Sequence, residues 1–167
     1  MADVSSWPDW QGRARPETKP WHYVDIEIDS AGYVAARDCP TGDCIVAAIA
    51  RQEATLRDHS ATRDRRAEAL VWLIHLLGDL HQPLHCADDH DRGGNEVPVW
   101  IDDRRSNLHA LWDRAPNELA QAEVGEDAAS AALDRRITAA QRAAWRRGDP
   151  ARWASESFRL ARDRIYR

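Results

Sequence analysis

The chain has 167 residues, of which 43% are hydrophobic, and its formal net charge is -5. This length and composition predict one domain with a buried core over residues 1–167. They exclude a membrane-spanning protein, because no apolar run reaches the roughly 18 residues that a span requires. The acidic balance also argues against an extended surface that tracks nucleic-acid phosphates, which usually carries a basic stripe.

The N-terminal third predicts short elements. Residues 1–20 combine prolines with mixed charge, which favours irregular structure with one short helix. Residues 21–28 alternate weakly, and their pattern alone leaves a strand or a helix open. Asp43 can N-cap a helix from Cys44 to about Asp58. The apolar stripe of that helix would be Ile45, Val46, Ala48 and Ile49.

The middle and C-terminal parts predict longer helices. A helix is expected from about Thr62 to Leu80, with one apolar face over Leu70, Leu73, Ile74 and Leu77 that is widened by Trp72 and Leu76. Alternation at Val97, Val99 and Ile101 predicts a short hairpin near 97–106. Further helices are expected from about 107, from about 117 to 147 with a break at Gly125 left open, and after Asp149-Pro150. The expected class is therefore all-α.

Three histidines and a carboxylate occupy eleven residues at the end of the long predicted helix. His75 and Asp79 are four residues apart, so on a helix their side chains share one face. Pro83 must stop or kink that helix, because it lacks an N–H and clashes with the preceding turn. His85 can then approach the same space from another direction. Imidazole and carboxylate are the usual ligands of zinc, so this spacing predicts a metal site.

Two other stretches offer the same residue types. Asn107-Leu-His109-Ala-Leu-Trp-Asp113 again places a histidine and an aspartate four apart, and Asp9 and His22 lie upstream. Together the candidate ligands are Asp9, His22, His75, Asp79, His85, His109 and Asp113. Seven ligands are too many for one tetrahedral zinc, so they predict a multinuclear site.

The chain contains three cysteines. Cys39 and Cys44 flank a short turn that a disulfide could close, which would indicate an oxidising compartment. Cys86 is left over beside His85, and we expect a buried free thiol there in preference to another ligand.

The motifs His-x3-Asp-x-His-Gln-Pro-Leu-His, Asp-x-Gly-Gly-Asn and Asn-Leu-His-x2-Trp-Asp resemble those of the S1/P1 nuclease family, zinc-dependent nucleases similar in fold to zinc phospholipase C. The likeness runs from about Ser6 to about Tyr166. It implies a helical bundle of that type, with residues 1–167 forming part of one domain that is trimmed at both ends. It also favours a helix start at Trp21.

The resemblance implies roles for particular residues. Asp9, His22, His75 and Asp79 would hold one zinc, and His85, His109 and Asp113 a second. Asp9 and Asp79 would be catalytic together with Arg13, the nearest match to a family arginine that neutralises the phosphate. Tyr23 would stack on a base and Asp25 would hydrogen-bond it, with Asn95 as a further base contact. The implied substrate-binding residues are thus Tyr23, Asp25 and Asn95.

The function implied by this likeness is hydrolysis of single-stranded DNA and RNA to 5′-phosphate products, with removal of 3′-phosphates from nucleotides. The family uses three zincs. Two are expected here, because the N-terminal Trp and His that complete the third site are not found. A secreted or periplasmic location is implied, although no signal peptide is visible, and no membrane or obligate protein partner is evident. The alternatives are a phosphodiesterase like zinc phospholipase C and a catalytically impaired zinc domain.

Overall fold

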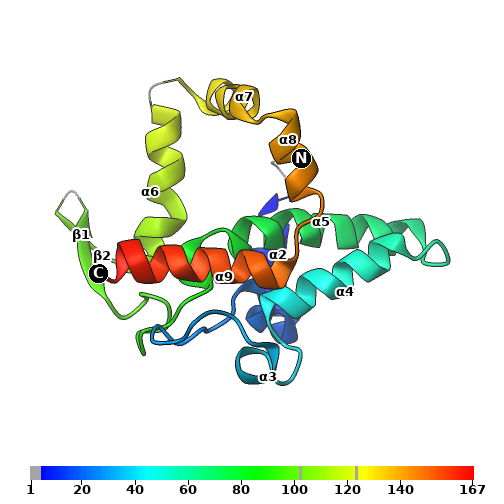
Figure 1. Cartoon of the computed structure of the whole chain (residues 1–167), viewed down its shortest axis with the longest axis horizontal. Coiled ribbons are helices and arrows are strands. Elements are labelled where there is room, and N and C mark those ends of the chain that lie inside the picture. The colour runs from blue at the N-terminus through cyan, green and yellow to red at the C-terminus, as the bar shows by residue number, and fades with distance from the viewer. Residues whose placement is uncertain (1–4, 102, 123) are drawn as a thin grey trace. The chain divides into compact units, whose positions relative to one another are not determined.

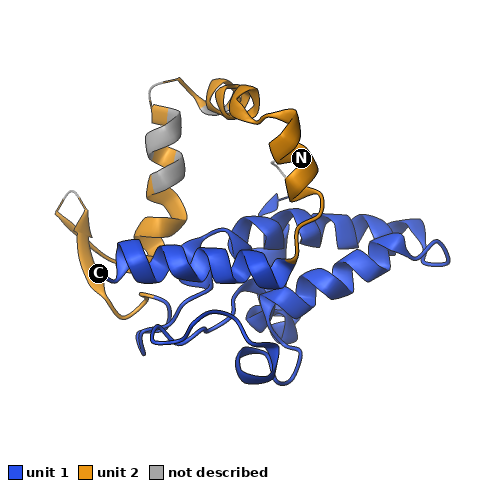
Figure 2. Cartoon of the chain, viewed as in Figure 1, with its two compact units in different colours: residues 1–93, 150–167 blue, residues 94–149 orange. Residues whose placement is uncertain are grey.

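The computed structural model of the chain describes residues 5–101, 103–122 and 124–167 (Figure 1). It divides into two compact units, one formed by residues 1–93 and 150–167 and the other by residues 94–149 (Figure 2). Helices dominate both units, with one two-stranded hairpin among the described residues, so the predicted all-α class is confirmed. Among the helices of the described residues, none combines the length and the apolar character that crossing a membrane requires.

Helix α5 (Arg63–Leu80) is the long helix of the first unit. Its start agrees with prediction, because the Thr62 side chain caps it by accepting a hydrogen bond from the Arg65 N–H at 3.3 Å. The predicted apolar face is confirmed in part, because Trp72 and Leu76 are buried whereas Leu70 is 44% exposed. The fully buried positions are Ala69, Trp72, Leu76 and Leu80, and Leu73, Ile74 and Leu77 are half-buried. The face that becomes buried is decided by the neighbouring helices, which periodicity alone does not reveal.

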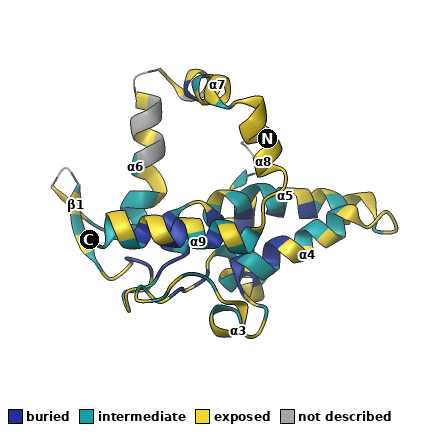
Figure 3. Ribbon diagram, in the orientation of Figure 1, coloured by how far each residue is buried: buried dark blue, intermediate teal, exposed yellow. Residues whose placement is uncertain are grey.

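Two further helices enclose the core of the first unit with α5. Helix α4 (Ile45–Arg57) packs along α5, and α9 (Pro150–Leu160) contacts both (Figures 1 and 3). The hydroxyl of Ser157 on α9 donates a 2.7 Å hydrogen bond to the Leu80 carbonyl, one of the groups that α5 leaves unpaired at its C-terminal end. Helix α9 continues into a π-helical turn, η3 (Ala161–Ile165).

The start of α4 differs from prediction by one residue and in its cap. Cys44 is the N-cap residue, and no side chain caps the helix. The predicted Asp43 cap is wrong, because the Asp43 carboxylate accepts the indole N–H of Trp21 at 3.2 Å. The predicted disulfide between Cys39 and Cys44 is present, just after the short helix α3 (Ala35–Asp38). Cys86 is a buried free thiol, as expected.

The N-terminal segment forms helix α2 (Trp7–Ala14) and the 3-10 helix η1 (Pro16–His22). A helix start at Trp21 is therefore wrong, because Trp21 and His22 end a helix and the backbone is extended from Tyr23. Burial then alternates along the chain in the manner of a strand, with Val24 and Ile26 buried between exposed neighbours.

This extended segment pairs with the chain that follows α5. The short 3-10 helix η2 (Pro83–His85) comes first. The Val24 N–H then donates to the His85 carbonyl at 2.8 Å, and the Asp88 N–H donates to the Ile26 carbonyl at 3.0 Å. Glu27 and Asp88 form a parallel bridge. The segments that follow His22 and His85 are thus held side by side.

The described part of the second unit contains the predicted hairpin and three helices. Strands β1 (Pro98–Ile101) and β2 (Arg104–Asn107) are antiparallel. Helices α6 (Leu108–Ala122), α7 (Glu126–Arg136) and α8 (Ala139–Trp145) follow. The single helix predicted over 117–147 is therefore wrong, although the break near Gly125 is confirmed. A second break falls before α8, where Thr138 and Gln141 form a capping box that starts a new helix. This capping box was not identified from the sequence.

Candidate metal centre

Four polar side chains from three elements converge in the first unit. Asp9 comes from α2, His22 from the end of η1, and His75 and Asp79 from α5. His22 Nδ1 and His75 Nε2 lie 2.9 Å apart, and each lies 2.9 Å from Asp79 Oδ2. Asp9 Oδ1 completes the set, at 3.3 Å from His75 Nε2 and 3.8 Å from His22 Nδ1. We call these four residues the Asp9–Asp79 cluster.

Local structure accounts for this convergence. The spacing of four residues places His75 directly beside Asp79 on one face of α5. His22 is brought to the same face because its ring packs on the buried Trp72, with ring centroids 5.8 Å apart. Trp72 also makes edge contacts with Trp7 and Trp21, which flank the ends of α2 and η1. One buried indole therefore positions both N-terminal elements against α5.

Backbone carbonyls orient two of the histidines. His75 Nδ1 lies 2.7 Å from the Ser5 carbonyl, and His85 Nδ1 lies 2.9 Å from the His22 carbonyl. A carbonyl can only accept, so in both rings Nδ1 carries the proton that is donated. Nε2 is then the nitrogen that each ring can offer to a metal. Such outer hydrogen bonds are the usual means of fixing a metal-binding imidazole.

The charges in the cluster are strongly coupled. Burial lowers the pKa of His75, but the hydrogen bonds that its ring donates to Asp79 and Asp9 outweigh burial and raise that pKa to about 10. Burial raises the pKa of Asp79, but its hydrogen bonds with His22 and His75 dominate and hold that pKa well below the ordinary value. Without a metal, His75 is therefore a cation beside an ionised Asp79.

The donor set fits zinc in type and spacing. Two imidazole nitrogens and two carboxylate oxygens are standard zinc ligands. Ligand atoms about 2.0–2.2 Å from a tetrahedral zinc are roughly 3.3–3.6 Å from one another. The five separations described above, 2.9–3.8 Å, bracket that range, and Asp9, His22 and His75 by themselves form a group that could hold a metal ion. A small cation could replace the proton on His75 without a large rearrangement.

The remaining three candidate ligands divide between the two units. His85 belongs to the first unit, where its Nδ1 lies 3.8 Å from Asp79 Oδ1, the oxygen that faces away from the zinc-fitting set. His109 and Asp113 lie one turn apart on α6 in the second unit, with Nε2 and Oδ1 separated by 3.7 Å. That these three side chains share a metal stays a prediction.

The candidate substrate-binding residues are also placed in different units. Tyr23 and Asp25 lie on the exposed face of the extended segment that follows His22. Burial and the nearby Asp88 and Glu27 raise the pKa of Asp25, while burial and Asp25 raise the pKa of Tyr23. Asn95 is exposed in the second unit, where it lines a small pocket. Their contacts with substrate stay predictions.

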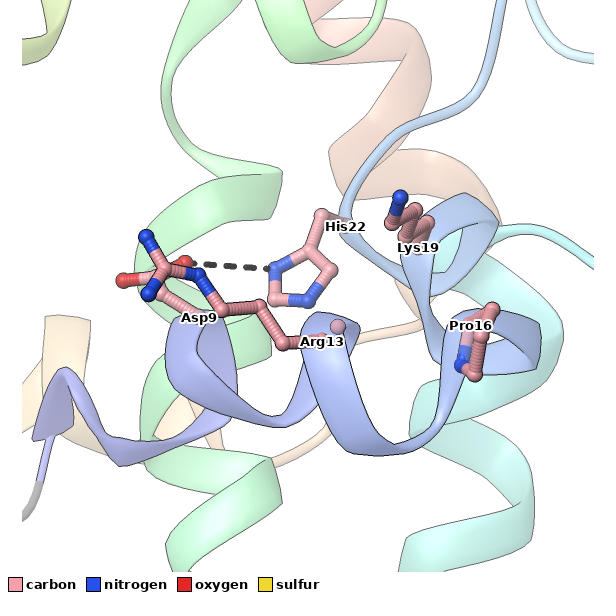
Figure 4. A pocket seen from close by; sticks show the side chains of 6 residues that line it. Asp9, Arg13, Pro16, Lys19 and His22 are labelled. Carbon is pink, nitrogen blue, oxygen red and sulfur yellow. Dashed lines mark ion pairs between the residues drawn. The ribbon is translucent and has the colours of Figure 1, made fainter.

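A pocket of about 450 Å³ opens beside the cluster (Figure 4). It is lined by Asp9, Gly12, Arg13, Pro16, Lys19 and His22. Arg13, the candidate phosphate-binding residue, thus lines the same pocket as the candidate metal ligands Asp9 and His22. Arg13 follows Asp9 by four positions, about one turn of α2. Lys19 was not singled out from the sequence. Its position three residues before a candidate ligand is the signal that was available.

Two other contributors were missed. Ser5 takes part only through its backbone carbonyl, for which no side-chain pattern exists. Asp88 holds the glycine turn, since its Oδ1 accepts from the backbone N–H groups of Asp91 and Gly93 at 3.1 Å. The sequence did offer a hint for Asp88, because an aspartate shortly before paired glycines commonly forms such a turn.

Comparison with known proteins adds a family to this geometry. The family model described as S1/P1 Nuclease matches residues 1–167. Endonuclease 4 of Arabidopsis thaliana is 38% identical over 128 residues, covering 68% of this chain and 42% of that protein. Nuclease P1 of Penicillium citrinum is 31% identical over 182 residues, covering 96% and 66%. Nuclease S1 of Aspergillus oryzae is 33% identical over 126 residues, covering 72% and 43%. The chain thus spans between 42% and 66% of the length of these relatives.

Proposed function

The chain belongs to the S1/P1 nuclease family, and from this premise we propose that it is a zinc-dependent phosphodiesterase. Its substrates would be single-stranded DNA and RNA, cut to leave 5′-phosphates, together with nucleotides from which it removes a 3′-phosphate. The observation that carries the proposal is the convergence of two imidazole nitrogens on one carboxylate oxygen in the Asp9–Asp79 cluster.

The residues that would hold zinc follow from that geometry. Asp9, His22, His75 and Asp79 would hold one ion, and His85, His109 and Asp113 a second. Asp79 would be central to the first set, because its Oδ2 lies 2.9 Å from both His22 and His75. Zinc in such a site supplies Lewis-acid chemistry, lowering the pKa of a water molecule and withdrawing charge from phosphoryl oxygens.

Protein side chains would do the positioning. Arg13 borders the pocket beside Asp9, where its guanidinium can neutralise a phosphate oxygen (Figure 4). Tyr23 is 41% exposed directly after His22, so a base could stack on its ring within one nucleotide of the metal. Asp25 follows on the same face and could accept hydrogen bonds from that base, and Asn95 would be a further base contact.

Single-strand preference would follow from the stacking contact. A base must leave its own stack before it can lie on Tyr23, and a duplex opposes this by the free energy of unpairing and unstacking.

The disulfide between Cys39 and Cys44 supports a secreted or periplasmic location for the protein, because disulfides persist in oxidising compartments.

Hydrolysis of matched oligonucleotides tests the proposal. We expect the zinc-loaded chain to cut a single-stranded dodecamer much faster than the same strand in a duplex, with 5′-phosphates detected by mass spectrometry. Removing the metal with a chelator should stop the reaction, and restoring zinc should recover it. Equal rates on duplex and single strand, or cleavage that survives chelation, would contradict the proposal. Turnover of phosphatidylcholine micelles but not of DNA would instead favour an activity like that of zinc phospholipase C.

A further inference from the structure

Lys19 is the only lysine in a chain that contains 22 arginines. The structure places this single ammonium in the wall of the pocket beside the Asp9–Asp79 cluster, across from Arg13. Lysine differs from arginine in being a compact, strongly hydrated point charge that suits monodentate contact with phosphate. The one place where the chain uses it therefore calls for a physical reason.

The backbone around Lys19 is firmly held. Thr18 is fully buried, and both its N–H and its hydroxyl donate to the Arg15 carbonyl, at 3.0 and 2.8 Å. Arg15 is fixed in turn by an ion pair with Glu68 at 2.8 Å. Pro20 follows Lys19 and restricts the backbone on the other side. An exposed side chain thus projects from a rigid base.

The stem of Lys19 lies over Gly12 of α2. A Cβ placed at Gly12 would meet Lys19 Cγ at 3.4 Å and Cε at 3.7 Å. These are ordinary van der Waals separations, so the lysine stem lies close beside α2 at Gly12. Because Gly12 and Lys19 both line the pocket, the apolar stem covers part of α2 while the ammonium remains available to a ligand.

Neither cation of the pocket is committed to a protein acid. Among residues 5–101, 103–122 and 124–167, no carboxylate forms an ion pair with Lys19 or Arg13, whereas other cations of the first unit, such as Arg15 and Arg37, are paired. Asp9 lies in the same pocket, but its carboxylate is directed at His22 and His75. Two uncommitted positive charges thus face one cavity in a chain of net charge -5.

We propose that Lys19 binds a phosphate of the substrate next to the one that is hydrolysed, so that the pocket is a second phosphate subsite. Figure 4 places Asp9 and the Arg13 guanidinium on one side of the His22 ring and Lys19 on the other. Arg13 therefore serves the reacting phosphate and Lys19 its neighbour. The inference rests on the proposed function for its substrate class, but the subsite can be tested without turnover.

The direct test uses the uniqueness of this lysine. Reductive methylation with ¹³C-formaldehyde retains the charge and labels one side-chain amine, whose signal is assigned by its loss in Lys19→Arg. Titrating the zinc-loaded chain with a nuclease-resistant phosphorothioate trinucleotide should shift the Lys19 signal, whereas uncharged adenosine should leave it in place. Inorganic phosphate should shift it more weakly, because it lacks the anchoring base. An unmoved Lys19 signal in the presence of bound trinucleotide would overturn the subsite.

A kinetic test identifies the phosphate. Lys19→Gln should raise KM for a trinucleotide about fivefold, the upper end for an exposed charge pair, with kcat little changed. Lys19→Arg should keep KM close to the wild-type value. The control is Arg63→Gln, which removes a positive charge at the opposite end of α5 from the cluster and should leave KM unchanged. Bis(4-nitrophenyl) phosphate has a single phosphodiester, so Lys19→Gln should leave its hydrolysis unchanged.

Neutral linkages complete the test. Replacing the adjacent phosphate by a methylphosphonate should raise the KM of the wild type by the same factor as Lys19→Gln does. The two changes together should raise KM no more than either change alone. Additive losses, or equal losses on both substrates, would place Lys19 at the reacting phosphate or outside the site. If the wild type cut no phosphodiester while the Lys19 signal still shifted, the proposed function would fail and the phosphate subsite would stand.

Discussion

His22 and His75 meet edge to face, with Nδ1 of one ring 2.9 Å from Nε2 of the other and the ring planes at 80°. Both atoms also lie 2.9 Å from the same oxygen of Asp79. Three electron-rich atoms at this spacing need a proton or a cation among them. The arrangement explains why the metal-free cluster holds an extra proton, and it gives the first set of predictions.

Replacement of Asp79 should remove metal binding and hydrolysis together. We expect Asp79→Ala to lose zinc and all measurable turnover, because its Oδ2 lies 2.9 Å from a nitrogen of both histidines, closer than the Asp9 carboxylate. Zinc content by mass spectrometry and turnover of a single-stranded oligonucleotide measure the two effects. Asp64→Ala, in the exposed first turn of the same helix, is the control and should keep both. Full turnover by Asp79→Ala would refute the assignment.

Replacement of Tyr23 should affect binding more than chemistry. Stacking on a base contributes about 1–3 kcal/mol, so Tyr23→Ala should raise KM with a much smaller change in kcat. Tyr23→Phe keeps the aromatic face and should behave like the wild type. Steady-state kinetics on a single-stranded oligonucleotide decides the matter, and an unchanged KM in Tyr23→Ala would show that the ring does not bind substrate.

Stability should depend on pH in opposite ways with and without zinc. The pKa of His75 is raised to about 10, so its stabilising contribution is full below about 6.5, the unfolded value, and is lost as pH rises toward 10. The pKa of Asp79 is lowered, so its contribution is full above about 4 and is lost as pH falls further. The metal-free protein should therefore be most stable between about pH 4 and 6.5.

Zinc should reverse that trend on the alkaline side. Binding must displace the proton of His75, so zinc affinity should rise with pH, and protons should be released into weakly buffered solution at pH 7. Thermal unfolding with chelator and with zinc, at pH 5, 7 and 9, measures both curves. Zinc stabilisation that is equal at pH 5 and pH 9 would contradict this account.

Trp72 should be the most costly single truncation in the first unit. Its indole is 1% exposed and supports Trp7, Trp21 and His22. Trp72→Ala should lower the free energy of unfolding by about 3–5 kcal/mol and weaken zinc binding as well. Trp100→Ala, at a position that is 71% exposed, should change stability by less than about 0.5 kcal/mol. Urea denaturation of the two variants gives the comparison.

Local signals in the sequence were sufficient for part of the fold. Thr62 before a periodic run, the alternation at 97–101 and the spacing of four between His75 and Asp79 all act within one or two turns of backbone, and each gave the observed local structure. Features that depend on distant partners were missed. Asp43 was expected to cap a helix, but its carboxylate bonds Trp21, 22 residues away.

The candidate site shows the same division. The residue types and spacings indicated which side chains to consider, while their convergence depends on Trp72 and on the pairing of two extended segments. Lys19 could not be placed by pattern, because its proximity to Asp9 comes from the fold of 15–20 back over Gly12. The spacing of four predicts that His109 and Asp113 lie together on α6. It carries no information on their distance from His85, because His85 belongs to the other unit.

The parallel pairing of 23–28 with 85–88 fixes the distance between two parts of the site. His22 and His85 stand at corresponding ends of the two paired segments, so the hydrogen bonds that follow them set the separation of the two rings. Inserting one residue at Tyr23 would turn Val24 and Ile26 outward and misplace His22 in a single step. Insertions in 29–32 would leave this register intact. Single-residue insertions should therefore be tolerated in 29–32 but should disrupt the site when they fall within the paired residues that follow His22.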